Sequence, residues 1–229
     1  LVERAREILN MVEKTTLDIQ EQEQNLAGSI ATGAGEYQAT EVLAKLIGGF
    51  QKQYAAVSFE LFTSSADLLH DKLDKGLLDV AILQAPVDTT NYDYLRLPIR
   101  ETWCVLMRSD APLASKNAIT ASDLSGLPII LPARLQARSE IFNWLSGDIA
   151  KMRFIGNSNL LANTAVFVEQ CGYYGISVQM PLLDEKRFAY RPLTPALHSD
   201  ILLVWRRDRQ QSLALQKFLQ FAKCFLSIE

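Results

Sequence analysis

The stretch Leu68–Leu83, LLHDKLDKGLLDVAIL, contains most of one predicted helix and the whole of the next predicted strand. Ser64 and Ser65 precede it and offer the hydroxyls that cap helix N-termini, and Gly76 suits the end of the helix. The run LDVAIL after this glycine is continuous and bounded by polar residues, which is typical of a buried parallel strand. A helix followed at once by such a strand predicts one unit of a parallel α/β sheet.

The same alternation of strands and helices extends in both directions along the chain. Upstream, we expect a short strand at Ile30–Gly33, a helix from about Thr40 to Tyr54, and an alternating, half-buried strand at 57–61. Downstream strands are expected at TWCVLM, PIIL, MRFI, GISV and ILLVW, and helices at Gln136–Leu145, Leu160–Cys171 and Ser212–Leu226. Short connections in a β-α-β-α-β order predict a parallel sheet covered by helices, arranged as one long sheet or as two lobes.

The N-terminal segment has a different pattern. Residues 1 to about 26 contain no glycine or proline, and their apolar positions follow spacings of four and three, with Thr15 and Gln22 filling two places in the pattern. Those positions are Leu1, Ala5, Ile8, Val12, Ile19 and Leu26. The narrow apolar stripe predicts a long helix packed on a partner, most simply a second copy of the chain, with Gly28 as its C-terminal cap. A surface helix packed on its own domain is the alternative.

Composition limits the classes of function. The chain has 229 residues, of which 48% are hydrophobic and 21% charged, and its net charge of −3 lacks the basic footprint of a nucleic-acid-binding domain. No apolar run approaches the roughly 18 residues that span a bilayer. The charged N-terminus is no signal peptide, although a cleaved signal would leave no trace. Three widely spaced cysteines fit a reducing compartment, so we expect a cytoplasmic protein with no membrane partner.

Catalytic and cofactor motifs are not found in the sequence. Gly33-Ala34-Gly35 begins like a dinucleotide fingerprint, but the third glycine would fall at Gln38, and Glu36 would repel a pyrophosphate. The two histidines have no metal-like spacing, and the carboxylates form no evident acid–base pair. We therefore expect no enzyme, no metal and no cofactor.

Polar residues gather instead where predicted strands end. Glu36 and Tyr37 follow the first strand, Ser64 and Ser65 the second, and Gln84 the third, while Arg134 and Asn159 follow later strands. Ligands bind at this edge of such sheets, and the helix N-termini there favour anions. Ser65 and Asn159 as simple N-caps, and Arg134 as surface charge rather than a carboxylate clamp, are the alternatives. Together these residues predict a cleft that binds a small molecule.

The order of motifs resembles the LysR-type transcriptional regulators. LLHDKLDKGLLDVAIL is similar to that family's Leu-x-x-Gly-x-Leu-Asp-hydrophobic run. ITASDLSGLPIILP, VEQCGYYGISVQMP and LLVWRRDRQQSLALQKFLQF resemble later phrases in the same order, and LVERAREILNMVEK resembles the linker helix. The chain departs from the pattern at Ala55, which replaces a proline, and at Ala111, which replaces a histidine.

The resemblance implies an α/β, two-lobed fold like the type II periplasmic binding proteins, with an N-terminal linker helix. It implies a linker helix at 1–27, a first lobe at 28–97 and 193–229, and a second lobe at 98–192. Two crossover strands would act as hinges near Tyr94–Pro98 and Phe188–Pro192.

The same resemblance implies an effector-sensing and oligomerisation region. Seven residues would face the effector in the cleft: Glu36, Tyr37, Ser64, Ser65, Gln84, Arg134 and Asn159. The partners implied are a small-molecule effector, further copies in a homodimer or homotetramer, DNA through a winged helix-turn-helix that this sequence lacks, and RNA polymerase. Glu36 motivates the hypothesis of an amine-bearing or zwitterionic effector. A periplasmic solute-binding protein is the alternative, and a transferase or dehydratase of the same fold would need an acid–base pair.

Overall fold

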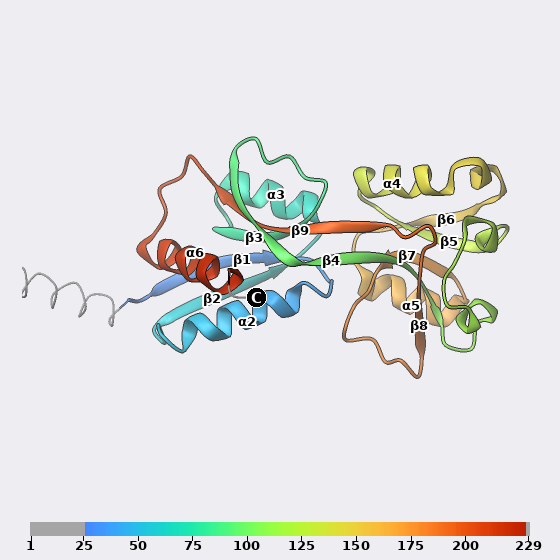
Figure 1. The fold of residues 1–229 in the computed structure, drawn as a ribbon, viewed down its shortest axis with the longest axis horizontal. Helices are drawn as coiled ribbons and strands as arrows, with labels where there is room; N and C mark the ends of the chain where they lie inside the picture. The colour runs from blue at the N-terminus through green and yellow to red at the C-terminus, as the bar shows by residue number, and fades with distance from the viewer. Residues whose placement is uncertain (1–25, 228–229) are drawn as a thin grey trace, which may run out of the picture.

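The computed structural model describes residues 26–227, which form two lobes lying side by side (Figure 1). Two long strands run from one lobe into the other and join them. The predicted N-terminal helix lies outside the described residues. Gly28, expected as the cap of that helix, instead begins strand β1 with a φ of +143°.

The first lobe contains a sheet with helices on both faces. Its strands β1 (Gly28–Ala34), β2 (Val57–Thr63) and β3 (Val80–Gln84) are parallel, with β1 in the middle. Helices α2 (Thr40–Gln51) and α6 (Leu213–Leu226) cover one face, and α3 (Ala66–Lys75) covers the other (Figure 1). The β-α-β-α-β unit predicted from the sequence is therefore confirmed, although α2 ends three residues before Tyr54.

The second lobe repeats this arrangement with a different set of strands. Strand β5 (Pro128–Pro132) is parallel to β6 (Arg153–Ser158) and to β7 (Tyr174–Val178). Helices α4 (Leu135–Leu145) and α5 (Leu161–Cys171) lie on opposite faces (Figure 1). Short 3₁₀ turns lie at Pro112–Ser115, Ala121–Leu124 and Ser146–Lys151. The three later helices each begin one residue from the predicted position.

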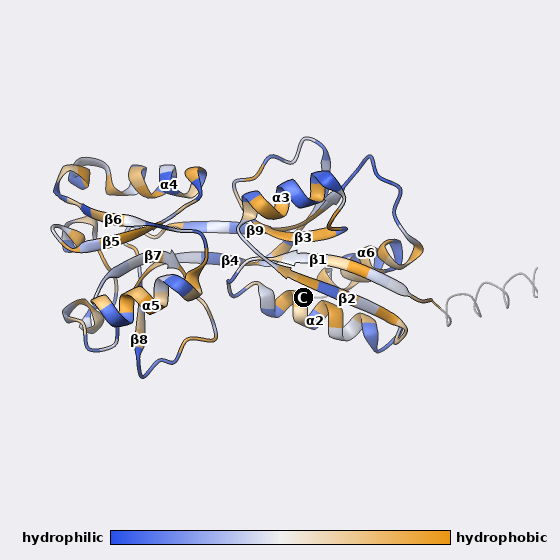
Figure 2. Cartoon of the chain, turned by 180° about the vertical axis from the view of Figure 1, so that it is seen from behind, coloured by the Kyte–Doolittle hydropathy of each residue, from blue (hydrophilic) through white to orange (hydrophobic). Residues whose placement is uncertain are grey.

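Strands β4 (Tyr92–Arg108) and β9 (His198–Arg206) connect the lobes and are antiparallel to each other. Their register shifts between Arg96 and Arg100, where they leave the first lobe. The crossing section is polar (Figure 2), and Arg100 Nε lies 2.9 Å from Asp200 Oδ1 on the neighbouring strand. The sheets are therefore mixed: β4 and β9 add an antiparallel pair to the parallel strands that the β-α-β-α-β order predicts.

The second predicted hinge is placed in the wrong segment. The segment Phe188–Pro192 is strand β8, which pairs along its whole length with residues 104–108 of β4 inside the second lobe. The second crossing is made by β9, whose residues 198–200 pair with residues 100–102 of β4. The first expected hinge, Tyr94–Pro98, lies within β4.

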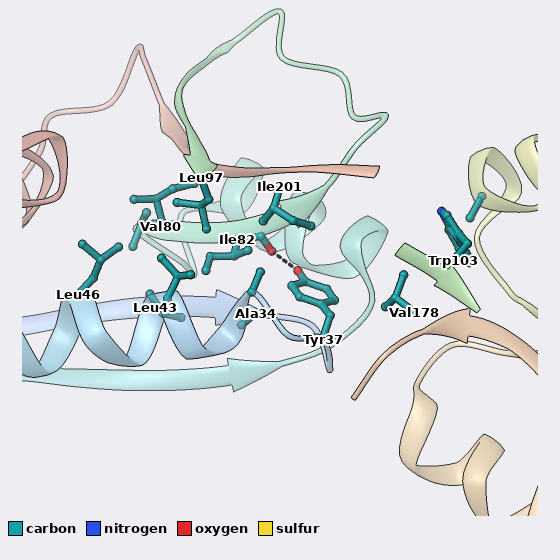
Figure 3. Packing of buried hydrophobic residues seen from close by; sticks show 14 of the residues in the cluster. Ala34, Tyr37, Leu43, Leu46, Val80, Ile82, Leu97, Trp103, Val178 and Ile201 are labelled. Carbon is teal, nitrogen blue, oxygen red and sulfur yellow. Dashed lines mark hydrogen bonds between the residues drawn. The ribbon is translucent and has the colours of Figure 1, made fainter. Parts of the chain in front are cut away.

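The stretch around α3 and β3 folds as its sequence predicts. Leu69 and Leu73 are fully buried on α3, and Gly76 ends the helix in the left-handed region at a φ of +69°. On the other face of β3, Val80 and Ile82 point toward Leu43 and Leu46 of α2 (Figure 3). Burial of each such leucine or valine side chain stabilises the fold by roughly 1.5–3 kcal/mol.

Candidate functional site

A cavity of about 190 Å³ lies between the two lobes. All seven residues predicted to face the cleft contribute to its lining: Glu36, Tyr37, Ser64, Ser65, Gln84, Arg134 and Asn159. They come from both lobes, at the carboxyl ends of β1, β2, β3, β5 and β6. The structure thus brings them to one place, and their role in binding an effector stays a prediction.

The glycines of the first turn serve close packing. A Cβ on Gly33 would lie 2.8 Å from side-chain atoms of Leu69 and Leu78, and a Cβ on Gly35 would lie 2.1 Å from the ring of Tyr37. The tyrosine ring therefore folds back over Gly35, and its hydroxyl donates a hydrogen bond of 2.5 Å to the carbonyl of Ile82 (Figure 3). Burial raises the pKa of Tyr37 above its ordinary value. Tyr37 forms a wall of the cleft and keeps its proton.

Glu36 crosses from the first lobe to the second. Its Oε2 accepts a hydrogen bond of 2.9 Å from the backbone N–H of Ala162, in the first turn of α5. The N-cap residue of this helix, Leu160, has no side chain that can cap it. The carboxylate of Glu36 therefore occupies the position where helix N–H groups attract an anion.

Arg134 crosses in the opposite direction. Its Nη1 donates to the carbonyl of Gln84 at 2.6 Å, its Nη2 donates to the carbonyl of Pro86, and its Nε lies 3.3 Å from Asp67 Oδ1. The side chain is only 10% exposed, and burial lowers the pKa of its guanidinium, which remains cationic at any ordinary pH. Arg134 is neither loose surface charge nor a free clamp for a ligand carboxylate.

The remaining polar residues have fewer internal contacts. Ser65 is at the N-cap position of α3 but makes no capping hydrogen bond, and Asn159 precedes the N-cap residue of α5. Ser65 therefore takes the expected N-cap position without the capping bond, and the N-cap alternative is wrong for Asn159. Among the described residues, the Nε2 of Gln84 is buried and has no hydrogen-bond partner. A buried donor left unpaired costs about 1–3 kcal/mol, so Gln84 is the cleft residue most in need of an acceptor.

The sequence prediction missed the apolar lining. Trp103, Ile130, Leu131, Ile176 and Val178 line the cleft from the second lobe. The sequence predicts the strands PIIL and GISV, but the rule that points to strand ends selects only polar residues beyond them. Trp103 comes from the crossing strand β4, which local periodicity could not place between the lobes.

Glu101 was also missed. It lies in the crossing section of β4, is 1% exposed, and accepts a hydrogen bond of 2.7 Å from the backbone N–H of Ala39. Burial raises the pKa of this carboxyl from 4.5 to about 6, while the backbone N–H groups of Ala39 and Gln38 oppose the rise. It does not line the cavity.

The described residues 26–227 offer neither a metal cluster nor a membrane-spanning helix. They contain no group of three or more His, Cys, Asp or Glu side chains arranged to hold a metal ion. They also contain no helix that is long and apolar enough to cross a membrane.

Comparison with known proteins identifies the family. Residues 23–227 match the model of the LysR substrate binding domain. An uncharacterized HTH-type transcriptional regulator, YvbU of Bacillus subtilis, is 25% identical over 224 residues, which are 95% of this chain and 74% of that protein. YybE of the same species is 30% identical over 104 residues, which are 45% of this chain and 35% of that protein.

Solved structures share the fold. The effector-binding domain of QuiR in complex with shikimate has a TM-score of 0.76 at 16% identity and covers 89% of this chain and 99% of that one. The regulatory domain of CcmR from Synechocystis, in complex with 2-PG, has a TM-score of 0.72 at 15% identity and covers 87% and 97%. The family match supports a regulator over a transport protein, and the family is not enzymatic. The chain belongs to the LysR substrate-binding domain family, the effector-binding domains of LysR-type transcriptional regulators.

Proposed function

We propose that this chain senses a small-molecule effector in the cleft between its lobes. The observation that carries the proposal is the cavity of about 190 Å³, whose polar lining comes from strand ends of both lobes. A ligand that contacts both lobes favours one lobe arrangement through its differential affinity for that arrangement. The shikimate and 2-PG complexes of the structural neighbours support a small metabolite as the ligand class.

Four residues are proposed to bind the effector directly: Ser64, Ser65, Gln84 and Asn159. The unpaired Nε2 of Gln84 supports this, because a ligand acceptor there satisfies a buried donor. Tyr37 shapes the wall, and Glu36 and Arg134 bridge the lobes. The lobes would move as two bodies, with β4 and β9 carrying the motion between them, and the second lobe would extend past the expected 98–192 to the crossing at 198–200 of β9.

The wider context is proposed from the family. The regulator would act in the cytoplasm as a homodimer or homotetramer, with DNA bound through a domain outside this sequence and RNA polymerase as a further partner. Strands β2 and β6 are the two ends of the strand order and expose apolar side chains, including Leu61 at 70% and Ile155 at 39%. Exposed apolar edge strands favour contact with another chain, which supports self-association.

Thermal melting with a ligand panel tests the sensing function. The panel contains amino acids, amines, organic acids, sugars and nucleotides. A ligand that binds only the folded state at 100 times its dissociation constant adds about 2.7 kcal/mol to stability. Once one class raises the melting temperature, Gln84→Met should reduce the rise, whereas Gln53→Met, at an exposed position away from the cleft, should not. An equal rise in wild type and Gln84→Met would refute the placement of the effector in this cleft.

A further inference from the structure

Glu36 and Arg134 are the charged side chains that bridge the cleft, and both bind backbone groups of the opposite lobe. Glu36 of the first lobe holds the first turn of α5 in the second lobe, through the N–H of Ala162. Arg134 of the second lobe holds the carbonyls of Gln84 and Pro86 in the first. A ligand entering the cleft therefore finds these charges engaged by protein groups.

The N-terminus of α5 would otherwise be an anion site. Its first N–H groups have no intrahelical acceptor, and the helix dipole adds partial positive charge there. The helix is 11 residues long, and its N-cap side chain makes no hydrogen bond to it. Within residues 26–227, the carboxylate that accepts from this turn is that of Glu36, 126 positions away in the sequence.

We propose that Glu36 is an internal occupant of this anion position and that it selects uncharged effectors over anionic ones. The inference rests on the proposed function of the cleft and names the class of its ligand. An anionic effector must displace the Glu36 carboxylate from the N–H of Ala162 or lie beside it and be repelled. Asp67, which also lines the cleft, adds a second negative charge.

Arg134 does not offer its positive charge to an anionic ligand. Its guanidinium donates to two carbonyls and lies beside Asp67, so clamping a ligand anion would leave the carbonyls of Gln84 and Pro86 without this donor. The groups left for a ligand are neutral: the side chains of Ser64, Ser65, Gln84 and Asn159. They face an apolar wall that includes Trp103 and Ile176. This lining suits a molecule with hydroxyl or amide groups on one side and an apolar face on the other.

The test uses the whole 229-residue chain and its Glu36→Ser variant, with benzoate and sulfate as anionic probes and benzamide as the uncharged match to benzoate. Affinities are measured by titration calorimetry, after thermal melting shows that each variant is folded. Glu185→Ser is the control, because it removes one negative charge at an exposed position that does not line the cleft. Glu36→Gln, which keeps an acceptor for Ala162 and loses the charge, replaces Glu36→Ser if that variant does not fold.

We expect Glu36→Ser to bind benzoate or sulfate about tenfold more tightly than wild type does, with a smaller change for benzamide, while Glu185→Ser behaves as wild type. For Glu36→Gln the expected gain is about threefold. No gain in anion affinity in a folded variant, or an equal gain in Glu185→Ser, overturns the proposal. The outcome is separate from that of the ligand panel, since wild type can respond to an uncharged ligand whatever Glu36 does.

Discussion

Replacing Glu101 by glutamine should change how the stability of the protein depends on pH. Glu101 is 1% exposed in the crossing section of β4, and one of its oxygens accepts from the N–H of Ala39. Its other oxygen, Oε2, has no partner among the described residues. Glutamine keeps an oxygen for Ala39 but never ionises. The variant therefore isolates the effect of burying the negative charge.

The magnitude follows from the pKa of Glu101, which burial raises from 4.5 to about 6. A raised pKa means that the folded state holds the proton more tightly than the unfolded state does. The stabilisation that comes from this tighter binding of the proton is complete below the pKa of Glu101 in the unfolded chain. It is lost as pH rises through about 6. Since one pKa unit corresponds to about 1.4 kcal/mol, the ionised carboxylate costs the folded state about 2 kcal/mol near neutral pH. Between about pH 5 and pH 7.5 the contribution of Glu101 to the free energy of unfolding falls by about 1.2 kcal/mol.

Urea unfolding, monitored by tryptophan fluorescence, measures the free energy of unfolding of wild type and variant at both pH values. We expect the stability of Glu101→Gln relative to wild type to rise by about 1.2 kcal/mol from the lower pH to the higher. Any constant penalty for the unpaired amide of glutamine cancels in this comparison. Glu41→Gln, on the exposed side of α2, controls for the loss of one carboxylate without the burial. A difference between Glu101→Gln and wild type that stays the same at both pH values would refute the reasoning.

Three further predictions concern stability, each measured by urea unfolding. Tyr37→Phe should destabilise by about 1–3 kcal/mol, because the buried carbonyl of Ile82 loses its donor; an unchanged midpoint would contradict this. Arg134→Met should destabilise by a similar amount, since two carbonyls lose a charged donor, and a variant as stable as wild type would show that the bridge contributes nothing. Gly33→Ala should destabilise by about 1–3 kcal/mol, because its Cβ would clash with Leu69; a neutral effect would mean that the core yields easily.

Much of the fold was predictable because its signals are local. The apolar spacing on α3, the glycine at its end and the apolar run of β3 each act within a few residues, and they fixed the helix, its end and the strand. The polar part of the cleft lining followed from the rule that parallel strands present their carboxyl ends at one edge. That rule needs only the order of elements, so it placed Glu36, Gln84 and Asn159 in one cavity.

What could not be predicted depends on pairing between distant segments. Strand β8 is the five-residue segment FAYRP and β9 the nine-residue segment HSDILLVWR, and nothing local says which of them leaves the second lobe. Likewise, the partners of Arg134 lie about 50 residues away along the chain, and that of Glu36 lies 126 away. The sequence showed charged residues at the cleft, but only the fold shows that they bind the chain itself.

The contacts that Glu36 and Arg134 make across the cleft limit how a ligand could act. Because Glu36 and Arg134 join the lobes through contacts within the chain, occupancy of the cleft alone does not imply closure of open lobes. A ligand that contacts only Ser64 and Ser65 stays within the first lobe, has no differential affinity for lobe arrangements, and shifts nothing. A ligand that also reaches Asn159 of the second lobe, or that weakens the Glu36 contact, changes the free energy of one arrangement relative to another. The signal would then be carried by exchange of contacts across the cleft.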